Sequence, residues 1–173
     1  SGNLSAFEAL YSRFFKQLYN YGRKVCQDTT TIEDAIHDLF LDIWRYREKL
    51  SATTSVKFYL YCALRRRIIK NKNKDSETSV FDFHINEFQV KKILSHEEDI
   101  IENEDQNERV GNLKKQLSSL SPRQYESVIL RFYEEFSYAE IAAILNVNEQ
   151  SARNLVQRGL EHLRSYTKPG TIA

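Results

Sequence analysis

Residues 137–164, SYAEIAAILNVNEQSARNLVQRGLEHLR, restrict the fold more than any other stretch of this chain. Ser137 and Glu140 have the spacing of a capping box, which predicts that a helix begins there. Asn146 then breaks the helical pattern, and Asn148 is a favourable N-cap for a second helix. Two helices joined by so short a turn predict a helix-turn-helix.

The second of these helices has two unlike faces. One face is an apolar stripe made of Ala152, Val156, Gly159 and Leu163. The other face carries Gln150, Arg153, Asn154, Gln157 and Arg158. Arg, Asn and Gln form paired hydrogen bonds with base edges in the major groove, so this face predicts a DNA-reading helix. A helical hairpin with a solvated polar face is the alternative.

Three helices are predicted in the first 74 residues. Ser5 and Glu8 have capping-box spacing ahead of a strongly amphipathic helix of about six turns. Thr30 and Glu33 have the same spacing ahead of a second helix, which runs to about residue 46. A third helix is expected over 56–72, and the residues expected to point inward from it are Phe58, Leu60, Tyr61, Leu64 and Ile68. The apolar faces of these helices predict a helical bundle with its own core.

The outward face of the second predicted helix holds Asp34, His37, Asp38, Leu41 and Asp42. Acidic side chains one turn apart repel each other, so they were not selected for the stability of an isolated helix. A basic partner outside the chain would explain them, and a merely solvated surface is the alternative.

Positive charge is concentrated in residues 56–74, which contain seven Lys or Arg side chains and no acidic one. Tyr59 and Tyr61 are interleaved with these basic residues. Basic side chains bind backbone phosphates and aromatic rings stack on unpaired bases, so this helix is predicted to bind nucleic acid. A basic helix that simply faces solvent is the alternative.

The distribution of charge divides the chain into three parts, although its net charge is only +1. Residues 1–74 carry 14 basic and 7 acidic side chains, residues 75–108 carry 2 and 11, and residues 109–173 carry 9 and 6. The acidic part cannot bury enough apolar surface to form a core and is predicted to be a linker. We therefore expect an all-α protein of two small helical domains, 1–74 and 109–173, joined by the acidic linker 75–108.

Residues 109–136 are predicted to add two helices ahead of the helix-turn-helix. The first passes through Leu113, Leu117 and Leu120. Ser121 and Pro122 then supply a cap and an N1 proline for the next helix, whose core face extends from Tyr125 to Tyr133.

Nothing in the sequence predicts a cofactor, a metal site or a disulfide. Cys26 and Cys62 lie far apart and each sits in a helical pattern, so buried free thiols are expected. His37-Asp38 is the dipeptide of HD-type metal phosphohydrolases, but such a site needs further converging ligands. The sequence shows no signal peptide or membrane-length apolar run, so we expect a cytoplasmic protein that does not insert into membranes.

Both halves of the chain resemble an extracytoplasmic-function-type sigma factor, the minimal two-domain class of bacterial sigma factors. The first half does so through FEALYSRFFKQLYNYGRKV, EDAIHDLFLDIWRYREKL and SVKFYLYCALRRRIIKN. The second half does so through LSPRQYESVILRFYEEFSYAEIAAILNVNEQSARNLVQRGLEHLR. Two separate modules in the expected order make this resemblance more specific than a helix-turn-helix alone.

The resemblance implies a non-enzymatic promoter-specificity subunit without a cofactor, whose partners are RNA polymerase core, promoter DNA and an anti-sigma factor. It implies that core polymerase is contacted by Asp34, His37, Asp38 and Leu41. It implies that the minus-ten promoter element is contacted by Lys57, Tyr59, Arg65, Arg66 and Lys70. It implies that the minus-thirty-five element is contacted by Arg131, Gln150, Ser151, Arg153, Asn154, Gln157 and Arg158, with Arg131 on a phosphate.

This chain departs from the family pattern at several positions. His37 stands where the family usually has Gln, Arg66 where it often has Asn, and Leu155 where a basic residue is common. Gly159 replaces a usual Ala at a cost of about 1 kcal/mol in helix propensity, which predicts close packing on the first helix of the helix-turn-helix. Asn146 replaces a frequent turn Gly, and Asn tolerates the left-handed conformation that such a turn needs.

Two other functions fit parts of the sequence. One is a stand-alone helix-turn-helix transcriptional regulator, and the other is a sigma-like decoy that binds an anti-sigma partner without initiating transcription. The resemblance also implies that the acidic linker threads a basic channel of the polymerase. In the free protein we expect this linker to fold back on the two basic domains and hold them closed.

Overall fold

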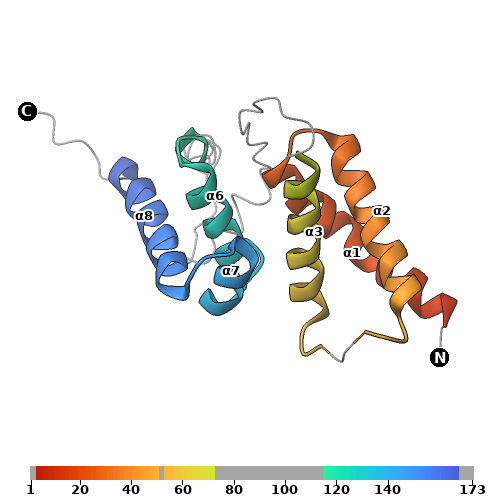
Figure 1. The fold of residues 1–173 in the computed structure, drawn as a ribbon. Coiled ribbons are helices and arrows are strands. Elements are labelled where there is room, and N and C mark those ends of the chain that lie inside the picture. Colours follow the sequence, from red (N-terminus) through yellow and green to blue (C-terminus); the bar gives the residue numbers. More distant parts are fainter. Residues whose placement is uncertain (1–2, 51–52, 73–114, 168–173) are drawn as a thin grey trace, which may run out of the picture. The chain divides into compact units, whose positions relative to one another are not determined.

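A computed structural model describes residues 3–50, 53–72 and 115–167 of the chain. The described residues form helices and turns and contain no strand, which confirms the all-α prediction. The chain divides into two compact units, Ser1–Asp82 and Phe83–Ala173, drawn in Figure 1. The acidic segment 75–108 lies outside the described residues, as does the start of the helix predicted through Leu113, Leu117 and Leu120; residues 115–118 of that helix are helical, and Leu117 and Leu120 are buried.

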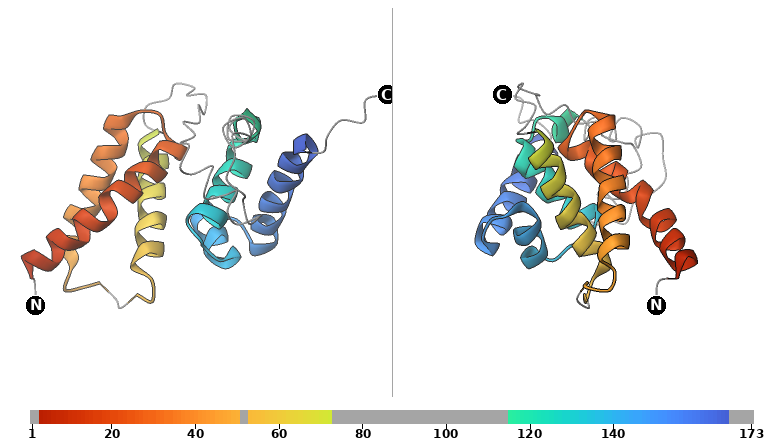
Figure 2. Two further views of the ribbon diagram at one scale, coloured as in Figure 1. Left: turned by 180° about the vertical axis from the view of Figure 1, so that it is seen from behind. Right: turned by 45° about the vertical axis from the view of Figure 1, so that its right-hand side comes forward.

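The first unit contains three helices, α1 (Leu4–Val25), α2 (Thr29–Tyr46) and α3 (Val56–Lys72). Each of them packs against the other two, as the views in Figures 1 and 2 also show. The most deeply buried large side chains come from all three helices: Leu18, Tyr21, Ile32, Ile36, Leu39, Leu60, Tyr61, Leu64 and Ile68. The three predicted helices are therefore confirmed, together with the core that they share.

The first two helices are capped differently from the prediction. Asn3 caps α1, since its Oδ1 accepts from the backbone N–H of Ser5 at 3.0 Å. Asp28 caps α2, accepting from the backbone N–H of Thr30 at 3.2 Å and of Thr31 at 3.0 Å. The predicted boxes at 5 and 30 were wrong because an extended Asn or Asp two residues earlier already provides the acceptor.

α1 and α2 are closely packed at Gly22. A Cβ atom on this residue would lie 2.5 Å from Ile32 Cγ2, closer than carbon atoms pack. Both residues are buried. The absence of a side chain at 22 therefore permits this helix crossing. Cys26 just beyond it is a buried thiol outside any disulfide, as predicted, whereas Cys62 forms no disulfide but is only half-buried.

The second unit is built from α6 (Pro122–Val128), η1 (Ile129–Tyr133), α7 (Tyr138–Leu145) and α8 (Glu149–Thr167). The predicted cap is confirmed, because Ser121 and Gln124 form a complete capping box with Pro122 in the first turn. The helix does not stay α-helical to Tyr133, however, because its last five residues form a π-helix. The core of this unit contains Leu117, Leu120, Tyr125, Val128, Ile129 and Leu163.

α7 and α8 form the predicted helix-turn-helix. The Ser137–Glu140 capping box is present at the start of α7. Asn146 ends α7 in the left-handed conformation, with φ 55° and ψ 53°. Asn148 then caps α8, its Oδ1 accepting from the backbone N–H of Ser151 at 2.7 Å. Each of these local predictions is confirmed.

The apolar stripe of α8 is buried along its whole length. α8 packs against both α6 and α7. A Cβ atom on Gly159 would lie 2.8 Å from Val128 Cγ2 in α6. Close packing at Gly159 is therefore confirmed, but its partner is α6 and not the first helix of the helix-turn-helix, because α8 packs against both helices and turns this position towards α6.

Candidate functional site

The outward face of α2 presents the first group of predicted contact residues. Those residues, all exposed, are Asp34, His37, Asp38 and Leu41. The opposite face buries Ile32, Ala35, Ile36, Leu39 and Phe40. Leu41 leaves 48% of its surface exposed although it is fully apolar. An apolar side chain among carboxylates can bind a partner by burial and by charge at once.

His37 is not an isolated exposed side chain. Its Nε2 lies 2.9 Å from the hydroxyl of Tyr11, and its ring is stacked on those of Tyr11 and Phe15. Burial, reinforced by the negative charge of Glu33, raises the pKa of Tyr11, so its hydroxyl keeps its proton at neutral pH. α1 therefore holds the imidazole in a set orientation on the α2 surface.

Asp42 differs from the other acids of this face. Its Oδ2 accepts from the Nη2 of Arg67 at 2.7 Å, joining α2 to α3. Both side chains are about a third exposed, at 37% and 31%. Asp42 is therefore tied to the fold of its own unit, and Asp34 and Asp38 are the acids left for an external partner.

The basic helix α3 divides its predicted residues between surface and core. Arg66 and Lys70 are exposed, Tyr59 is 39% exposed, and Lys57 and Arg65 are half-buried. Tyr61, in contrast, is fully buried, with its ring centroid 4.7 Å from that of Tyr21. The expectation that Tyr61 points inward is therefore confirmed: although it is interleaved with the basic residues in sequence, α3 turns its ring into the bundle core.

α8 brings the predicted reading residues together on its exposed side. Gln150, Arg153, Asn154, Gln157 and Arg158 are exposed, and Ser151 is half-buried. Several of these side chains are paired along the helix. Gln150 Nε2 donates to Asn154 Oδ1 at 3.0 Å, and Gln157 Nε2 donates to Glu161 Oε1 at 2.9 Å. These pairs pre-arrange amide groups on one surface of the helix.

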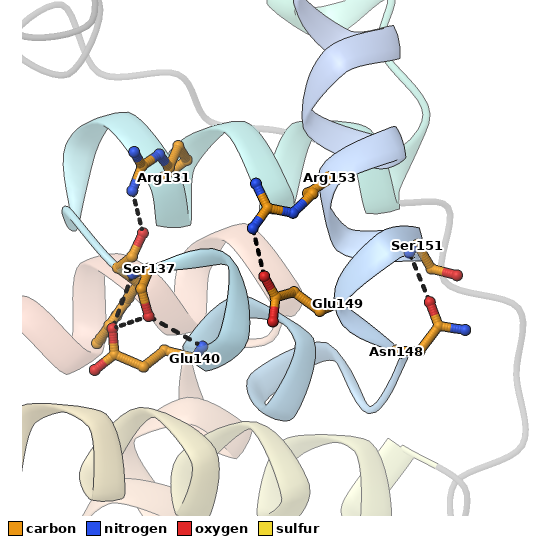
Figure 3. A network of polar contacts seen from close by, with 8 residues as sticks. Arg131, Ser137, Glu140, Asn148, Glu149, Ser151 and Arg153 are labelled. Atoms are coloured by element: carbon orange, nitrogen blue, oxygen red, sulfur yellow. Dashed lines mark hydrogen bonds and ion pairs between the residues drawn. The ribbon is translucent and has the colours of Figure 1, made fainter.

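Arg131 and Arg153 lie near the helix-turn-helix, each with its own hydrogen-bond acceptor, as Figure 3 shows. Arg131, in η1, donates from Nη1 to the carbonyl of Phe136 at 3.0 Å. Arg153, in the first turns of α8, donates from Nη2 to Glu149 Oε1 at 2.5 Å. Both guanidinium groups also lie over the ring of Tyr138, with Cζ 4.8 Å and 4.5 Å from its centroid.

Within residues 3–50, 53–72 and 115–167, no three His, Cys, Asp or Glu side chains are close enough to hold a metal ion. Across the same residues, none of the helices has the length and apolar character needed to cross a bilayer.

Burial strongly raises the pKa of Tyr125 in the core of the second unit, so this phenol is neutral in the folded protein.

Several residues that shape these surfaces were missed in the sequence. Tyr11 is one of these, because no local pattern links it to His37 in another helix. Tyr138 and Glu149 were not assigned any role, although the spacing of Glu149 and Arg153 is that of a helical ion pair. That spacing was the one available signal, because contacts between helices leave no periodic mark in a sequence.

Comparison with known proteins identifies both units. The family model of sigma-70 region 2 matches residues 10–78, and that of sigma-70 region 4 matches residues 111–163. The chain is 23% identical to an ECF RNA polymerase sigma factor SigK of Mycobacterium sp. (strain KMS), covering 94% of this chain and 83% of that protein. It is 22% identical to SigX, an ECF RNA polymerase sigma factor of Bacillus subtilis (strain 168), over 92% of this chain and 82% of SigX.

The fold is also similar to those of two solved structures. The sigma factor RpoE, solved with the anti-sigma factor NepR from Bartonella quintana, matches with a TM-score of 0.65 at 19% identity, over 96% of this chain and 100% of RpoE. CnrH, solved with the cytosolic domain of CnrY, matches with a TM-score of 0.59 at 16% identity, over 95% and 89% of the two chains.

Proposed function

This chain belongs to the sigma-70 family and to its extracytoplasmic-function class, and we propose which of its surfaces contact the polymerase and the DNA. As a member of this class it is a non-enzymatic, promoter-recognising subunit of RNA polymerase. The two family models together span most of the described residues, one on each helical unit. This match of two modules in order, and not the helix-turn-helix alone, is the observation that carries the function.

We propose that the exposed face of α2 docks on RNA polymerase core through Asp34, His37, Asp38 and Leu41. The support is that the face presents two carboxylates that the bundle itself does not use, beside an exposed Leu. Asp42 is excluded from this set because it pairs with Arg67. A basic surface on the polymerase would satisfy the unpaired charges, and Leu41 would add apolar burial.

For promoter DNA, we propose two surfaces. Lys57, Tyr59, Arg65, Arg66 and Lys70 of α3 are assigned to the minus-ten element. Arg131 of η1 and Gln150, Ser151, Arg153, Asn154, Gln157 and Arg158 of α8 are assigned to the minus-thirty-five element. The exposed cations and the exposed ring of Tyr59 suit phosphates and an unpaired base, whereas the Arg and amide groups of α8 suit base edges in a major groove.

The remaining assignments rest on the family. We propose that residues 1–74 form the core-binding and minus-ten domain, 75–108 the acidic linker and 109–173 the minus-thirty-five domain. We also propose that the protein acts in the cytoplasm and is controlled by an anti-sigma factor, since the sigma factor RpoE was solved with the anti-sigma factor NepR and CnrH, of similar fold, with the cytosolic domain of CnrY.

The test is transcription by purified bacterial RNA polymerase core, with and without this chain, from a library of randomised promoters. Wild-type protein should direct initiation from a defined subset of the library. Asp34→Arg with Asp38→Arg should abolish both initiation and co-purification with core, while Glu48→Arg, which reverses an exposed charge next to α2, should change neither by more than about twofold.

The same test separates the other functions. A stand-alone regulator would select duplex DNA without the polymerase and would be indifferent to the α2 charge reversal. A decoy would bind an anti-sigma partner and leave transcription by core unchanged. Either of those results would contradict the proposed promoter-recognition role.

A further inference from the structure

Tyr138 lies between two of the arginines that we assign to promoter DNA, Arg131 and Arg153. It is the first residue of α7, is half-buried, and receives the guanidinium groups of Arg131 and Arg153 over its ring. Arg131 comes from η1 and Arg153 from α8, so one ring from a third element relates the two cations. A guanidinium stacked on an aromatic ring loses little hydrogen-bonding capacity, because its donors lie in its own plane.

The carboxylate of Glu149 accepts a hydrogen bond from the guanidinium group of Arg153. The two side chains are about half exposed, and the ion pair spans four residues of the first turns of α8. A carboxylate offers the same pairing geometry to Arg as a phosphate or the O6 and N7 acceptors of guanine. Arg153 must therefore leave Glu149, or share its donors with it, when it binds DNA.

We propose that Tyr138 and Glu149 determine how strictly Arg153 reads its base. Tyr138 is a positioning residue, which sets the plane in which the Arg153 fork is presented. Glu149 is a competitor, which DNA replaces favourably only where two base acceptors match that fork. A mismatched base offers less than the carboxylate and leaves Arg153 on Glu149, whereas the preferred base has to displace the carboxylate, so the pair lowers the preference for that base.

This inference rests on the proposed role of Arg153 in the minus-thirty-five surface. The expected size of each variant's effect on binding follows from the Tyr138–Arg153 and Glu149–Arg153 contacts. A cation–π contact at an exposed site corresponds to about a two- to fivefold effect on an equilibrium. An exposed ion pair of one helical turn corresponds to about a two- to threefold effect. Each variant should therefore alter the preference at one base position measurably, without abolishing promoter binding.

The experiment uses holoenzyme reconstituted from polymerase core and the full chain. It is bound to promoter fragments randomised in the upstream element, and the bound fraction is sequenced to give the preference at each position. Arg153→Ala should bring the preference at one position close to unity, which locates the base that Arg153 reads. Arg153→Lys, which keeps the charge but not the planar fork, should do the same.

Against that reference, Tyr138→Leu should lower the preference at the same position by about two- to fivefold and leave the other positions unchanged. Tyr138→Phe, which keeps the ring, should match wild type. Glu149→Gln should increase binding of fragments with the preferred base there by about two- to threefold, because that base no longer has to displace a carboxylate, while binding of fragments with other bases there stays constant.

An even loss of binding across the library with Tyr138→Leu would overturn the positioning role and leave the ring only a packing residue. An even gain with Glu149→Gln would overturn the competitor role, because it would mean general repulsion of DNA. Both exposed variants, Glu149→Gln and Arg153→Lys, keep the inference falsifiable if Tyr138→Leu does not fold. If Arg153→Ala leaves every preference intact, the assigned role of Arg153 fails first, and this result is distinct from the others.

Discussion

Gly22→Ala is expected to destabilise the first unit, although Ala is the better helix former. The added Cβ would lie 2.5 Å from Ile32 Cγ2, 3.4 Å from its Cγ1 and 3.5 Å from its Cβ. Ile32 is fully buried, and a β-branched side chain in a helix has essentially one χ1 rotamer. It cannot rotate away, so α1 and α2 must separate by roughly an ångström to restore a normal carbon contact.

The net effect is a difference of two terms. Overpacking of a buried site costs about 1–3 kcal/mol. The gain in helix propensity from Gly to Ala is about 1 kcal/mol in a helix interior and smaller in the last turn, where Gly22 lies. We therefore expect a loss of about 1–2 kcal/mol in the free energy of unfolding, or about 1 M in the urea midpoint.

Trp44 makes this measurement specific to one unit. It is the single tryptophan of the chain, and its ring centroid lies 5.0 Å from that of Phe7 in the first unit. Urea unfolding of the full chain, followed by Trp44 fluorescence, therefore reports this unit alone. Gly159→Ala, a matched change in the second unit, should not move the Trp44 transition.

A double-mutant cycle tests the cause. Ile32→Ala alone should destabilise the first unit strongly because it leaves a cavity. The loss of stability in the double variant, Gly22→Ala with Ile32→Ala, should be smaller than the sum of the two single losses by about 1 kcal/mol or more. A higher urea midpoint for Gly22→Ala, or strict additivity in the cycle, would refute the close helix crossing as the reason for glycine.

Three further predictions follow from individual contacts. Asp42→Ala should lower the stability of the first unit by about 1–2 kcal/mol because it leaves the Arg67 guanidinium without its 2.7 Å partner, and the Trp44 transition would reveal this. Asn146→Ala should destabilise the second unit by about 1 kcal/mol while Asn146→Gly should not, since φ is +55° there; thermal unfolding by circular dichroism distinguishes the two. Hydrogen bonds from the Thr31 hydroxyl and backbone lower the pKa of Asp28, so the stability contributed by this ionised cap is present above the unfolded-state pKa and is lost as pH falls through the lower folded-state value; Asp28→Asn should weaken that acid dependence of the Trp44 transition.

The sequence by itself determined the features that depend on neighbours along one helix. Capping boxes at Ser121 and Ser137, the left-handed turn at Asn146 and the apolar stripe of α8 were all predicted and are all present. They depend on hydrogen bonds and periodicity within a few residues, which a sequence displays directly. The family resemblance supplied the two-module organisation that no single motif would have established.

Where two local signals competed, the sequence was less decisive. The caps of α1 and α2 are Asn3 and Asp28, and not the Ser5 and Thr30 hydroxyls with the same nominal spacing. A cap at either position would satisfy the free N–H groups at the start of the helix. Which residue becomes the cap depends on the backbone conformation just outside the helix, which is extended at Asn3 and Asp28. The π-helical end at Ile129–Tyr133 likewise has no simple sequence signature.

Contacts between helices were decided only by the tertiary structure. Helical spacing predicted that Tyr61 points inward, but not that its ring would pack on that of Tyr21 in α1. Likewise, Gly159 packs on α6 instead of α7, and Tyr138 receives arginines from two other elements. Helical periodicity shows which side of a helix is apolar but not which neighbour covers it, because the rotation and crossing of each pair of helices follow from packing the whole core.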